Sequence, residues 1–131
     1  MQIMETKTMP RVLLVEDNSV NSLYTAQVLL RQGYEVIEAR NGIEALDILR
    51  TQSFDLILMD VRMPVLDGLE TTRRIREDLH LDTPVVALTA HAMSGDRDKC
   101  LASGMNYYLA KPYTKAQLLG ALKEVEADLG W

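Results

Sequence analysis

FDLILMD, residues 54–60, is the part of the sequence that says most about the fold. The run from Leu56 to Met59 is wholly apolar, and the next residue, Asp60, is a carboxylate. A continuous apolar run of this kind is typical of a strand in a parallel sheet whose two faces are both covered by helices. We therefore predict that residues 54–59 form the central strand of such a sheet and that Asp60 lies at its carboxyl end.

Similar units occur on both sides of this stretch. Short apolar runs rich in β-branched residues alternate with stretches of helical spacing, which indicates repeated strand and helix units. The expected strands are residues 11–15, 34–38, 54–59, 85–88 and 106–110, and the expected helices start near residues 19, 42, 69, 95 and 114. With right-handed crossovers, these units predict an α/β fold. It is a doubly wound, flavodoxin-like sheet of five parallel strands in the order 2-1-3-4-5, flanked by five helices.

Two of the expected helices carry clear apolar stripes. In the first, we expect Val20, Leu23, Tyr24 and residues 27–30 to face the core, and Gly33 to end the helix. The corresponding stripe of the last helix consists of Leu118, Leu122, Val125 and Leu129. These stripes predict which side of each helix packs on the sheet.

The composition limits the class of protein. With 131 residues, of which 47% are hydrophobic and 25% charged, the chain is suited to one soluble globular domain. We place this domain at residues 10–131, and we interpret residues 1–9 as a linker or a segment added for expression. A net charge of -5, without any Lys/Arg-rich run, argues against direct binding to nucleic acid.

The lone cysteine and the short apolar runs indicate a location. Cys100 cannot form an internal disulfide, so we interpret it as a structural residue in a reducing compartment. No apolar stretch reaches the ~20 residues that a membrane-spanning helix needs. We therefore expect a cytoplasmic domain that makes no contact with a membrane.

Polar and charged side chains follow four of the expected strands. Glu16 and Asp17 come after the first strand, Asp60 ends the third, Thr89 follows the fourth and Lys111 follows the fifth. Ligands of doubly wound sheets bind outside the carboxyl ends of the strands, near the point where the strand order reverses. We therefore expect these five side chains to converge.

The three carboxylates predict a metal site. Crowded carboxylates repel one another, and a hard divalent cation with oxygen ligands relieves that repulsion. Mg²⁺ is the expected ion, with Mn²⁺ as a substitute. Since Mg²⁺ usually takes only one or two carboxylates directly, we expect Asp17 and Asp60 as direct ligands and Glu16 as a ligand through water. The backbone carbonyl of Arg62 is a further candidate ligand.

The remaining groups suit phosphoryl transfer. Lys111 can pair with a carboxylate at rest and with a phosphoryl oxygen after reaction, and Thr89 offers a hydroxyl donor to the same group. Phosphoryl transfer mainly requires positioning and neutralisation of charge, and a carboxylate can serve as covalent acceptor. We predict Asp60 as the acceptor because it ends the central strand, whereas the acidic pair lies to one side.

Other functions explain these residues less well. Taken singly, each residue has an ordinary reading as a helix cap, a turn or a loop. A phosphatase of the haloacid dehalogenase type would need an acid two residues after Asp60, where Arg62 stands. A flavodoxin-like electron carrier would have to place an FMN phosphate beside Glu16 and Asp17, which would repel it. An interaction module without phosphorylation chemistry would not need Asp17, Asp60, Thr89 and Lys111 together.

Four stretches carry a resemblance to a known family. They are VEDN (15–18), MDVRMPVLDG (59–68), LTAHA (88–92) and SGMNYYLAKPY (103–113). From Arg11 to Leu129 the chain resembles the receiver domain of two-component response regulators. The motif wording is most similar to receivers of hybrid sensor histidine kinases.

The resemblance implies roles for individual residues. Glu16, Asp17 and Asp60 would bind Mg²⁺, with Asp60 as phosphoacceptor and Lys111 beside it. Thr89 and Tyr108 would be the switch residues. A cis peptide bond is typical before Pro112. Phosphorylation would alter the face formed by the fourth helix, fifth strand and fifth helix.

The resemblance also implies partners. The phosphodonor would be a histidine kinase or a histidine phosphotransfer domain of a phosphorelay, and the domain itself would self-phosphorylate from small donors and dephosphorylate itself. The host is expected to be a hybrid kinase, so the domain would be the cytoplasmic part of a membrane-bound sensor. The alternatives are a stand-alone single-domain response regulator and a receiver-like module that is not phosphorylated. A homodimer is left open, and His91 and His80 are interpreted as surface residues. One departure from the family is Asn106-Tyr107, where such receivers often carry two acidic residues.

Overall fold

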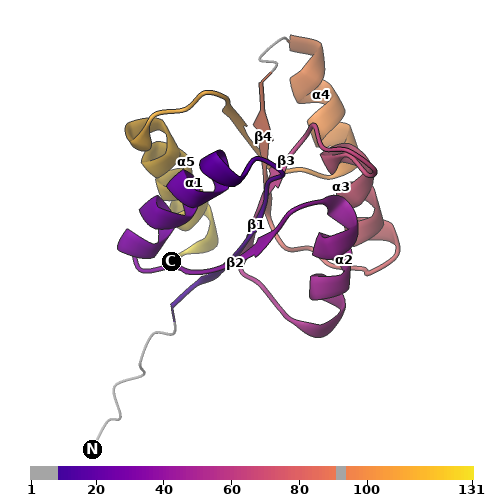
Figure 1. The fold of residues 1–131 in the computed structure, drawn as a ribbon, viewed down its shortest axis with the longest axis horizontal. Helices are drawn as coiled ribbons and strands as arrows, with labels where there is room; N and C mark the ends of the chain where they lie inside the picture. Colours follow the sequence, from indigo (N-terminus) through magenta and orange to yellow (C-terminus); the bar gives the residue numbers. More distant parts are fainter. Residues whose placement is uncertain (1–8, 91–93) are drawn as a thin grey trace, which may run out of the picture.

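The computed structural model describes residues 9–90 and 94–131, which form a sheet between two layers of helices (Figure 1). The strands are β1 (Arg11–Val15), β2 (Glu35–Ala39), β3 (Leu56–Asp60), β4 (Val85–Thr89) and β5 (Tyr107–Ala110). They pair in parallel in the order β2-β1-β3-β4-β5. The predicted sheet and strand order are therefore confirmed.

The helices cover both faces of the sheet. Over the described residues they are α1 (Ser19–Arg31), α2 (Gly42–Thr51), α3 (Gly68–Glu77), α4 (Ser94–Ser103) and α5 (Lys115–Leu129). Figure 1 shows α1 and α5 on one side and α2, α3 and α4 on the other. Because successive strand residues point to opposite faces, Ile57 and Met59 join the core under α2 and α3, while Leu56 and Leu58 join the core under α1 and α5.

The central strand matches the sequence prediction closely. All residues of β3 are buried, including Asp60 at its end. The strand begins two residues later than predicted. Phe54 lies before it as a buried residue whose ring is covered by the guanidinium of Arg11, 4.7 Å from the ring centroid.

The predicted core-facing stripe of α1 is largely wrong. Val20 is 73% exposed and Leu23 is 59% exposed, and Tyr24, Gln27 and Leu30 also face solvent. Of the predicted stripe, only Val28 and Leu29 are buried. The buried residues of this helix are Ser22, Thr25, Ala26, Val28 and Leu29.

Two hydrogen bonds explain the orientation of α1. The hydroxyl of Ser22 bonds the carboxylate of Glu38, and that of Thr25 lies 2.6 Å from the hydroxyl of Tyr113. Because their hydroxyls are hydrogen-bonded, Ser22 and Thr25 can be buried, and their small size lets α1 pack closely on the sheet. Four of the larger apolar residues, Val20, Leu23, Tyr24 and Leu30, then face outward.

The helix ends follow local chemistry. The side-chain oxygen of Asn18 accepts from the amides of Val20 and Asn21, at 3.0 Å each, and so caps the start of α1. Gly33 follows the helix with φ of 92°, a left-handed conformation that favours glycine. The predicted end of α1 at this glycine is confirmed.

In the last helix, the predicted stripe is correct except at its end. Leu118, Leu122 and Val125 are buried, whereas Leu129 is 40% exposed because the helix ends there. Trp131 packs in its place, with its ring centroid 6.2 Å from that of Tyr34. Within residues 9–90 and 94–131, no helix combines the length and the apolar character needed to cross a membrane.

Candidate metal centre and active site

The candidate site lies where β1, β3, β4 and β5 end. Glu16 and Asp17 directly follow β1, and Asp60 is the last residue of β3. One carboxylate oxygen from each of these three residues lies within 4.8 Å of the other two. The structure therefore brings together the three carboxylates that the sequence analysis singled out.

Backbone hydrogen bonds position these carboxylates. The amide of Glu16 donates to the carbonyl of Ala39 at 3.0 Å, which holds the end of β1 against β2. On β3, the amide of Val61 donates to the carbonyl of Leu88 at 2.9 Å, so the chain just after the strand stays attached to β4. The site is thus built on the sheet itself.

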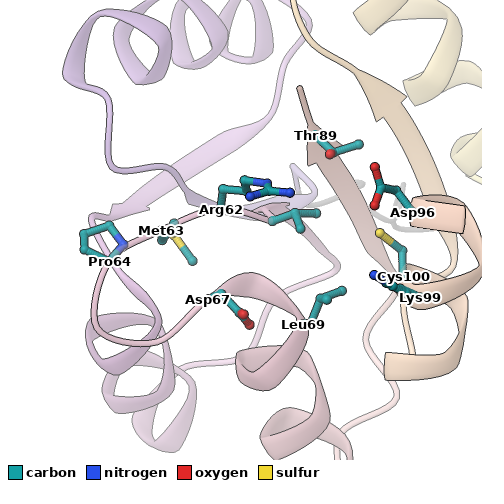
Figure 2. Close-up of a pocket in the computed structure, with 10 residues that line it drawn as sticks. Arg62, Met63, Pro64, Asp67, Leu69, Thr89, Asp96, Lys99 and Cys100 are labelled. Carbon is teal, nitrogen blue, oxygen red and sulfur yellow. The ribbon is translucent and has the colours of Figure 1, made fainter. Parts of the chain in front are cut away.

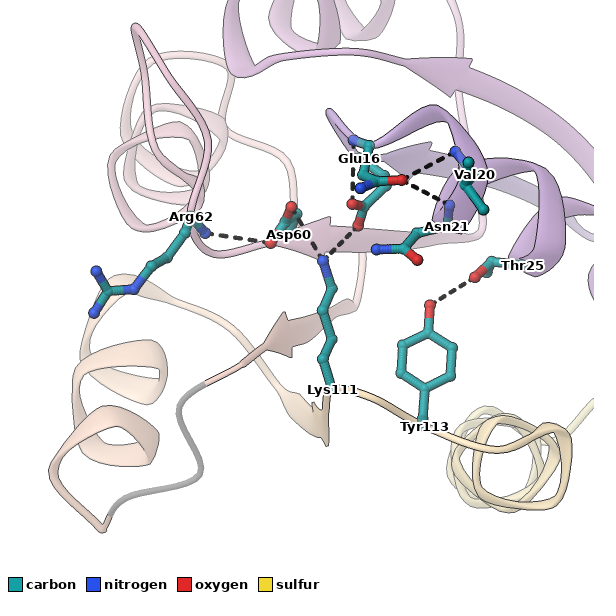
Figure 3. A network of polar contacts seen from close by, with 9 residues as sticks. Glu16, Val20, Asn21, Thr25, Asp60, Arg62, Lys111 and Tyr113 are labelled. Carbon is teal, nitrogen blue, oxygen red and sulfur yellow. Dashed lines mark hydrogen bonds and ion pairs between the residues drawn. The ribbon is translucent and has the colours of Figure 1, made fainter.

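Lys111 joins the cluster from the residue after β5 (Figure 3). Its Nζ atom lies 2.8 Å from Oε2 of Glu16 and 3.2 Å from Oδ2 of Asp60. Its amide donates to the carbonyl of Thr89 at 2.7 Å, which ties the ends of β4 and β5 together. The Lys111–Pro112 peptide bond is cis, the isomer that the resemblance implied.

The electrostatics show a surplus of negative charge. The pKa of Asp60 is raised to about 7, chiefly by burial and next by the negative charge of Glu16, while Lys111 opposes the change. Burial lowers the pKa of Lys111, but its bonds to Glu16 and its attraction to Asp60 outweigh that effect, so the pKa of Lys111 is raised overall. The single positive charge of Lys111 does not neutralise the three carboxylates of Glu16, Asp17 and Asp60.

The donor set suits a small divalent cation. At the ~2.1 Å bonds of Mg²⁺, neighbouring ligand oxygens lie about 3 Å apart and opposite ones about 4.2 Å apart. The spacing of the three carboxylates falls within reach of these values. Asp17 is exposed to solvent, whereas Oε2 of Glu16 is engaged by Lys111. Lys111 also pairs with Asp60, at a longer distance, so Asp17 is the most accessible carboxylate of the three.

The segment after Asp60 is also close to its carboxylate. The amide of Arg62 donates to Oδ1 of Asp60 at 3.3 Å, and the Arg62 side chain points away from the carboxylates in Figure 3. The backbone just after Asp60 therefore turns back and contacts the Asp60 carboxylate.

A cleft of about 490 Å³ lies beside the site, between the segment after β3 and α4 (Figure 2). Thr89, which is buried at the end of β4, lines it together with Arg62, Met63 and Cys100. Burial raises the pKa of the Cys100 thiol, and the charge of Asp96 adds to this effect. Cys100 is therefore a buried wall of the cleft, in line with its expected structural role.

The predicted switch tyrosine lies on the neighbouring strand. Tyr108 is partly buried on β5, where it packs against the core cluster that contains Cys100. It pairs with Ala87, two residues before Thr89 on β4. The two predicted switch residues are thus near neighbours across one pair of strands.

Sequence reasoning missed a second hollow of about 380 Å³ between α1 and the segment after β5. Tyr24 and Thr25 line it from α1, and Lys111, Pro112 and Tyr113 line it from the other side. The bond between Thr25 and Tyr113 spans 88 positions of the sequence. The only sequence signal for this hollow is Tyr113, the tyrosine after Lys-Pro. Its hydrogen-bond partner, Thr25, could not be identified from the sequence pattern.

Three other sequence observations concern the two histidines and Asn106. His80 is exposed, as predicted, with φ of 55°. His91 lies outside the described residues. The Oδ1 atom of Asn106 accepts from the amide of Val85 and from Nη2 of Arg76, at 2.9 Å each, so this departure from the family has a structural role.

Fold and site together define a class of protein. A doubly wound parallel sheet with a carboxylate cluster, a lysine and a threonine at the strand ends is the arrangement of a receiver domain. The chain belongs to the response regulator receiver domain family, whose model matches residues 12–123.

Two similar proteins place the chain within this family. It is 39% identical over 122 residues to the polar-differentiation response regulator DivK of Brucella anthropi, which covers 92% of this chain and 99% of that protein. It is 44% identical over 113 residues to the sensor histidine kinase GacS of Pseudomonas protegens, which covers 83% of this chain and 12% of that kinase.

A solved structure is similar as well. It is the receiver domain of the sensor histidine kinase PA1611 from Pseudomonas aeruginosa PAO1, with a magnesium ion coordinated in its active site cleft. The match has a TM-score of 0.81 and 43% identity, and it covers 94% of this chain and 99% of that one. The chain is therefore similar both to a whole single-domain regulator and to a small part of larger kinases.

Proposed function

We propose that Asp60 accepts a phosphoryl group in a Mg²⁺-dependent reaction and that this modification switches the domain between two states. The observation that carries the proposal is the convergence of Asp60 with Lys111, Glu16 and Asp17 at the ends of the strands. Asp60 is the central member of this set because it ends the buried middle strand, whereas Asp17 is exposed at the rim.

The chain's own residues divide the work of the transfer. An oxygen of the Asp60 carboxylate attacks phosphorus, an O–P bond forms, and the bond from phosphorus to the donor nitrogen breaks with its electron pair staying on the imidazole. A bound Mg²⁺ supplies positive charge to the phosphoryl oxygens. Lys111 lies 3.2 Å from Asp60 and can move its ammonium onto a phosphoryl oxygen. The same charge neutralisation supports later hydrolysis, so slow autodephosphorylation is expected.

The switch is proposed to pass through Thr89 and Tyr108. Thr89 lines the cleft of about 490 Å³, and this space lets its hydroxyl approach a phosphoryl group on Asp60. Tyr108 then turns inward, which changes the face formed by α4, β5 and α5. A new charge and its hydrogen bonds are enough to bias such a two-state element.

The donor is proposed to be a phosphohistidine of a histidine kinase or of a histidine phosphotransfer domain. Large apolar side chains of α1, including Val20, Leu23 and Tyr24, are exposed, and Tyr24 also lines the hollow beside Lys111. Exposed apolar groups that border a reactive site are typical of a protein docking surface. They favour a protein donor over a small phosphate ester.

We further propose that the domain, from Pro10 onward, is a receiver of a hybrid sensor histidine kinase on the cytoplasmic side of a membrane. Identity is 44% to GacS and 43% to the PA1611 receiver, compared with 39% to DivK. The alternative is a stand-alone regulator, which the match to nearly the whole of DivK supports. Dimerisation through the α4 face stays a prediction.

Intact-mass spectrometry tests the acceptor. Wild type and Asp60→Asn are incubated with Mg²⁺ and acetyl phosphate, and in parallel with a phosphorylated histidine phosphotransfer domain. We expect a phosphoryl adduct on wild type alone, lost in the absence of Mg²⁺. An adduct of equal yield on Asp60→Asn would place the acceptor elsewhere. A folded wild type without any adduct from either donor would favour the module that is not phosphorylated.

A further inference from the structure

Helix α3 begins against the backbone of the proposed acceptor. Gly68 is the first residue of α3, and a Cβ atom added there would lie 2.2 Å from the carbonyl oxygen of Asp60 and 2.9 Å from Cα of Val61. Both neighbouring atoms belong to the backbone, so neither can rotate out of the way. Only glycine allows the helix to start in this place.

A hydrogen bond holds the same contact from the other direction. The amide of Gly68 donates to the carbonyl of Val61 at 2.8 Å, while the amide of Val61 donates to Leu88 of β4 at 2.9 Å. The peptide units that follow Asp60 are therefore fixed between β4 on one side and the first turn of α3 on the other. The amide of Arg62, the next residue, reaches the Asp60 carboxylate at 3.3 Å.

We propose that Gly68 is a positioning residue for the phosphoacceptor. By lacking a side chain, it lets α3 press on the Asp60 and Val61 backbone and so fixes the Asp60 carboxylate and the adjacent Arg62 carbonyl relative to Asp17 and Lys111. The inference rests on the proposed function, since it concerns the same acceptor and metal site. As a consequence, a single methyl group added at Gly68 should displace Asp60, although none of the residues of the metal site is itself substituted.

A second glycine offers a matched control. A Cβ atom at Gly42, the first residue of α2, would lie 2.0 Å from Oγ1 of Thr71 and 3.0 Å from the carbonyl oxygen of Leu66. This contact is as short as the one at Gly68, but its nearest atom is a side-chain hydroxyl, and it falls between α2 and α3 rather than on Asp60. A Cβ atom at Gly120, in α5, would meet nothing within 4 Å and gives a control without a clash.

The experiment compares Gly68→Ala, Gly42→Ala and Gly120→Ala with wild type. Urea unfolding without Mg²⁺ measures stability, calorimetric titration with Mg²⁺ alone measures metal affinity, and intact mass over time measures phosphorylation by acetyl phosphate at saturating Mg²⁺. We expect Gly68→Ala to bind Mg²⁺ about tenfold more weakly or worse, as changes behind metal ligands do. Its phosphorylation should also slow, because displacement of a reacting group by about 1 Å can cost up to 10²-fold.

The controls separate positioning from folding. Gly42→Ala should also lose stability, though less than Gly68→Ala, yet keep Mg²⁺ affinity within about twofold, since its clash does not involve the site. If both variants lose affinity in proportion to their stability, or if Gly68→Ala behaves as wild type, the positioning role is overturned. If Gly68→Ala does not fold, Gly68→Ala and Gly42→Ala are each combined with Gly120→Ala, which should stabilise α5. If the double variant that carries Gly68→Ala still does not fold, the positioning role is overturned too, because the contact then serves the fold alone.

Failure of the proposed function gives a different result. If wild type binds Mg²⁺ but takes up no phosphoryl group from acetyl phosphate or from a phosphorylated histidine phosphotransfer domain, the acceptor proposal falls and the Mg²⁺ titration still decides the role of Gly68. If wild type does not bind Mg²⁺ at all, both proposals fall.

Discussion

The Asp60 carboxylate is held in a position that its charge opposes. It is 4% exposed, and among the described residues its only close cation, Lys111, is shared with the carboxylate of Glu16. Burial is the larger cause of its raised pKa, and Glu16 is the second. Such a group stores unfavourable free energy that a metal ion or a phosphoryl transfer can release.

The sign of this effect gives a prediction for Asp60→Asn without Mg²⁺. The pKa of Asp60 is about 7 in the folded protein, against 3.8 for an ordinary aspartate. Between these values the folded protein keeps a proton that the unfolded chain has lost, so its stability falls as the pH rises from about 4 to 7. Asp60→Asn removes the ionised group and should stabilise the protein by about 1 to 3 kcal/mol at pH 8.

Urea unfolding at pH 8 and pH 5, both with EDTA, checks this prediction. The gain should shrink at pH 5, where the wild-type carboxyl is largely protonated. A variant that is less stable than wild type at pH 8 would show that Asp60 is stabilised by its bond to Lys111 rather than strained by its surroundings.

Val65 gives a second prediction at the residue scale. It has φ of 71° and is 88% exposed, and around it the amide of Leu66 donates to the carbonyl of Pro64 at 2.8 Å. A non-glycine residue held in this left-handed region costs about 1 to 3 kcal/mol. Glycine would relieve that cost but adds about 0.5 to 1 kcal/mol of chain entropy to folding. Val65→Gly should therefore raise the free energy of unfolding by about 1 kcal/mol.

Thermal or urea unfolding measures this gain, with Val65→Ala as control. Alanine keeps the Cβ atom, so it should recover little of the strain. Equal stabilisation by alanine and glycine would mean that the β-branched side chain, not the backbone conformation, is the source of the cost.

At the scale of elements, α1 shows where helical spacing misleads. Val20, Leu23 and Tyr24 have the spacing of a core stripe, but the helix buries Ser22 and Thr25 instead. The reason lies in two distant partners, Glu38 and Tyr113, which satisfy the buried hydroxyls. A pattern read within one helix carries no information on such partners.

Paired substitutions in α1 test this orientation. Leu23→Ala should change stability by less than about 0.5 kcal/mol, as exposed substitutions do. Leu29→Ala should cost about 2 to 5 kcal/mol, because Leu29 is fully buried under the sheet. If Leu23→Ala were the more damaging of the two, the stripe predicted from the spacing would be the buried one after all.

For the whole molecule, strand order and site were predictable for the same reason. Runs such as residues 56–59 are apolar on both faces, so they fix a buried parallel sheet, and the sheet in turn brings its carboxyl ends together. Glu16, Asp60 and Lys111 therefore converge as expected. Contacts that depend on packing between distant elements, such as Gly68 against the Asp60 backbone, could not be read from the sequence, where Gly68 is only the last residue of the MDVRMPVLDG stretch.

The site and the stability of the whole domain should be linked through Mg²⁺. A ligand that binds only the folded state stabilises it by about 2.7 kcal/mol at one hundred times its dissociation constant. Binding requires an ionised Asp60, whose pKa is about 7, so Mg²⁺ must displace a proton below that pH. We expect Mg²⁺ to raise the melting temperature of wild type clearly at pH 8 and much less at pH 6. Melting curves with Mg²⁺ or EDTA at both pH values measure this, and Asp60→Asn, which lacks the ionisable ligand, should lose most of the response. A Mg²⁺ effect that is the same at both pH values, or that persists undiminished in Asp60→Asn, would mean that the ion binds the domain somewhere other than the carboxylate cluster.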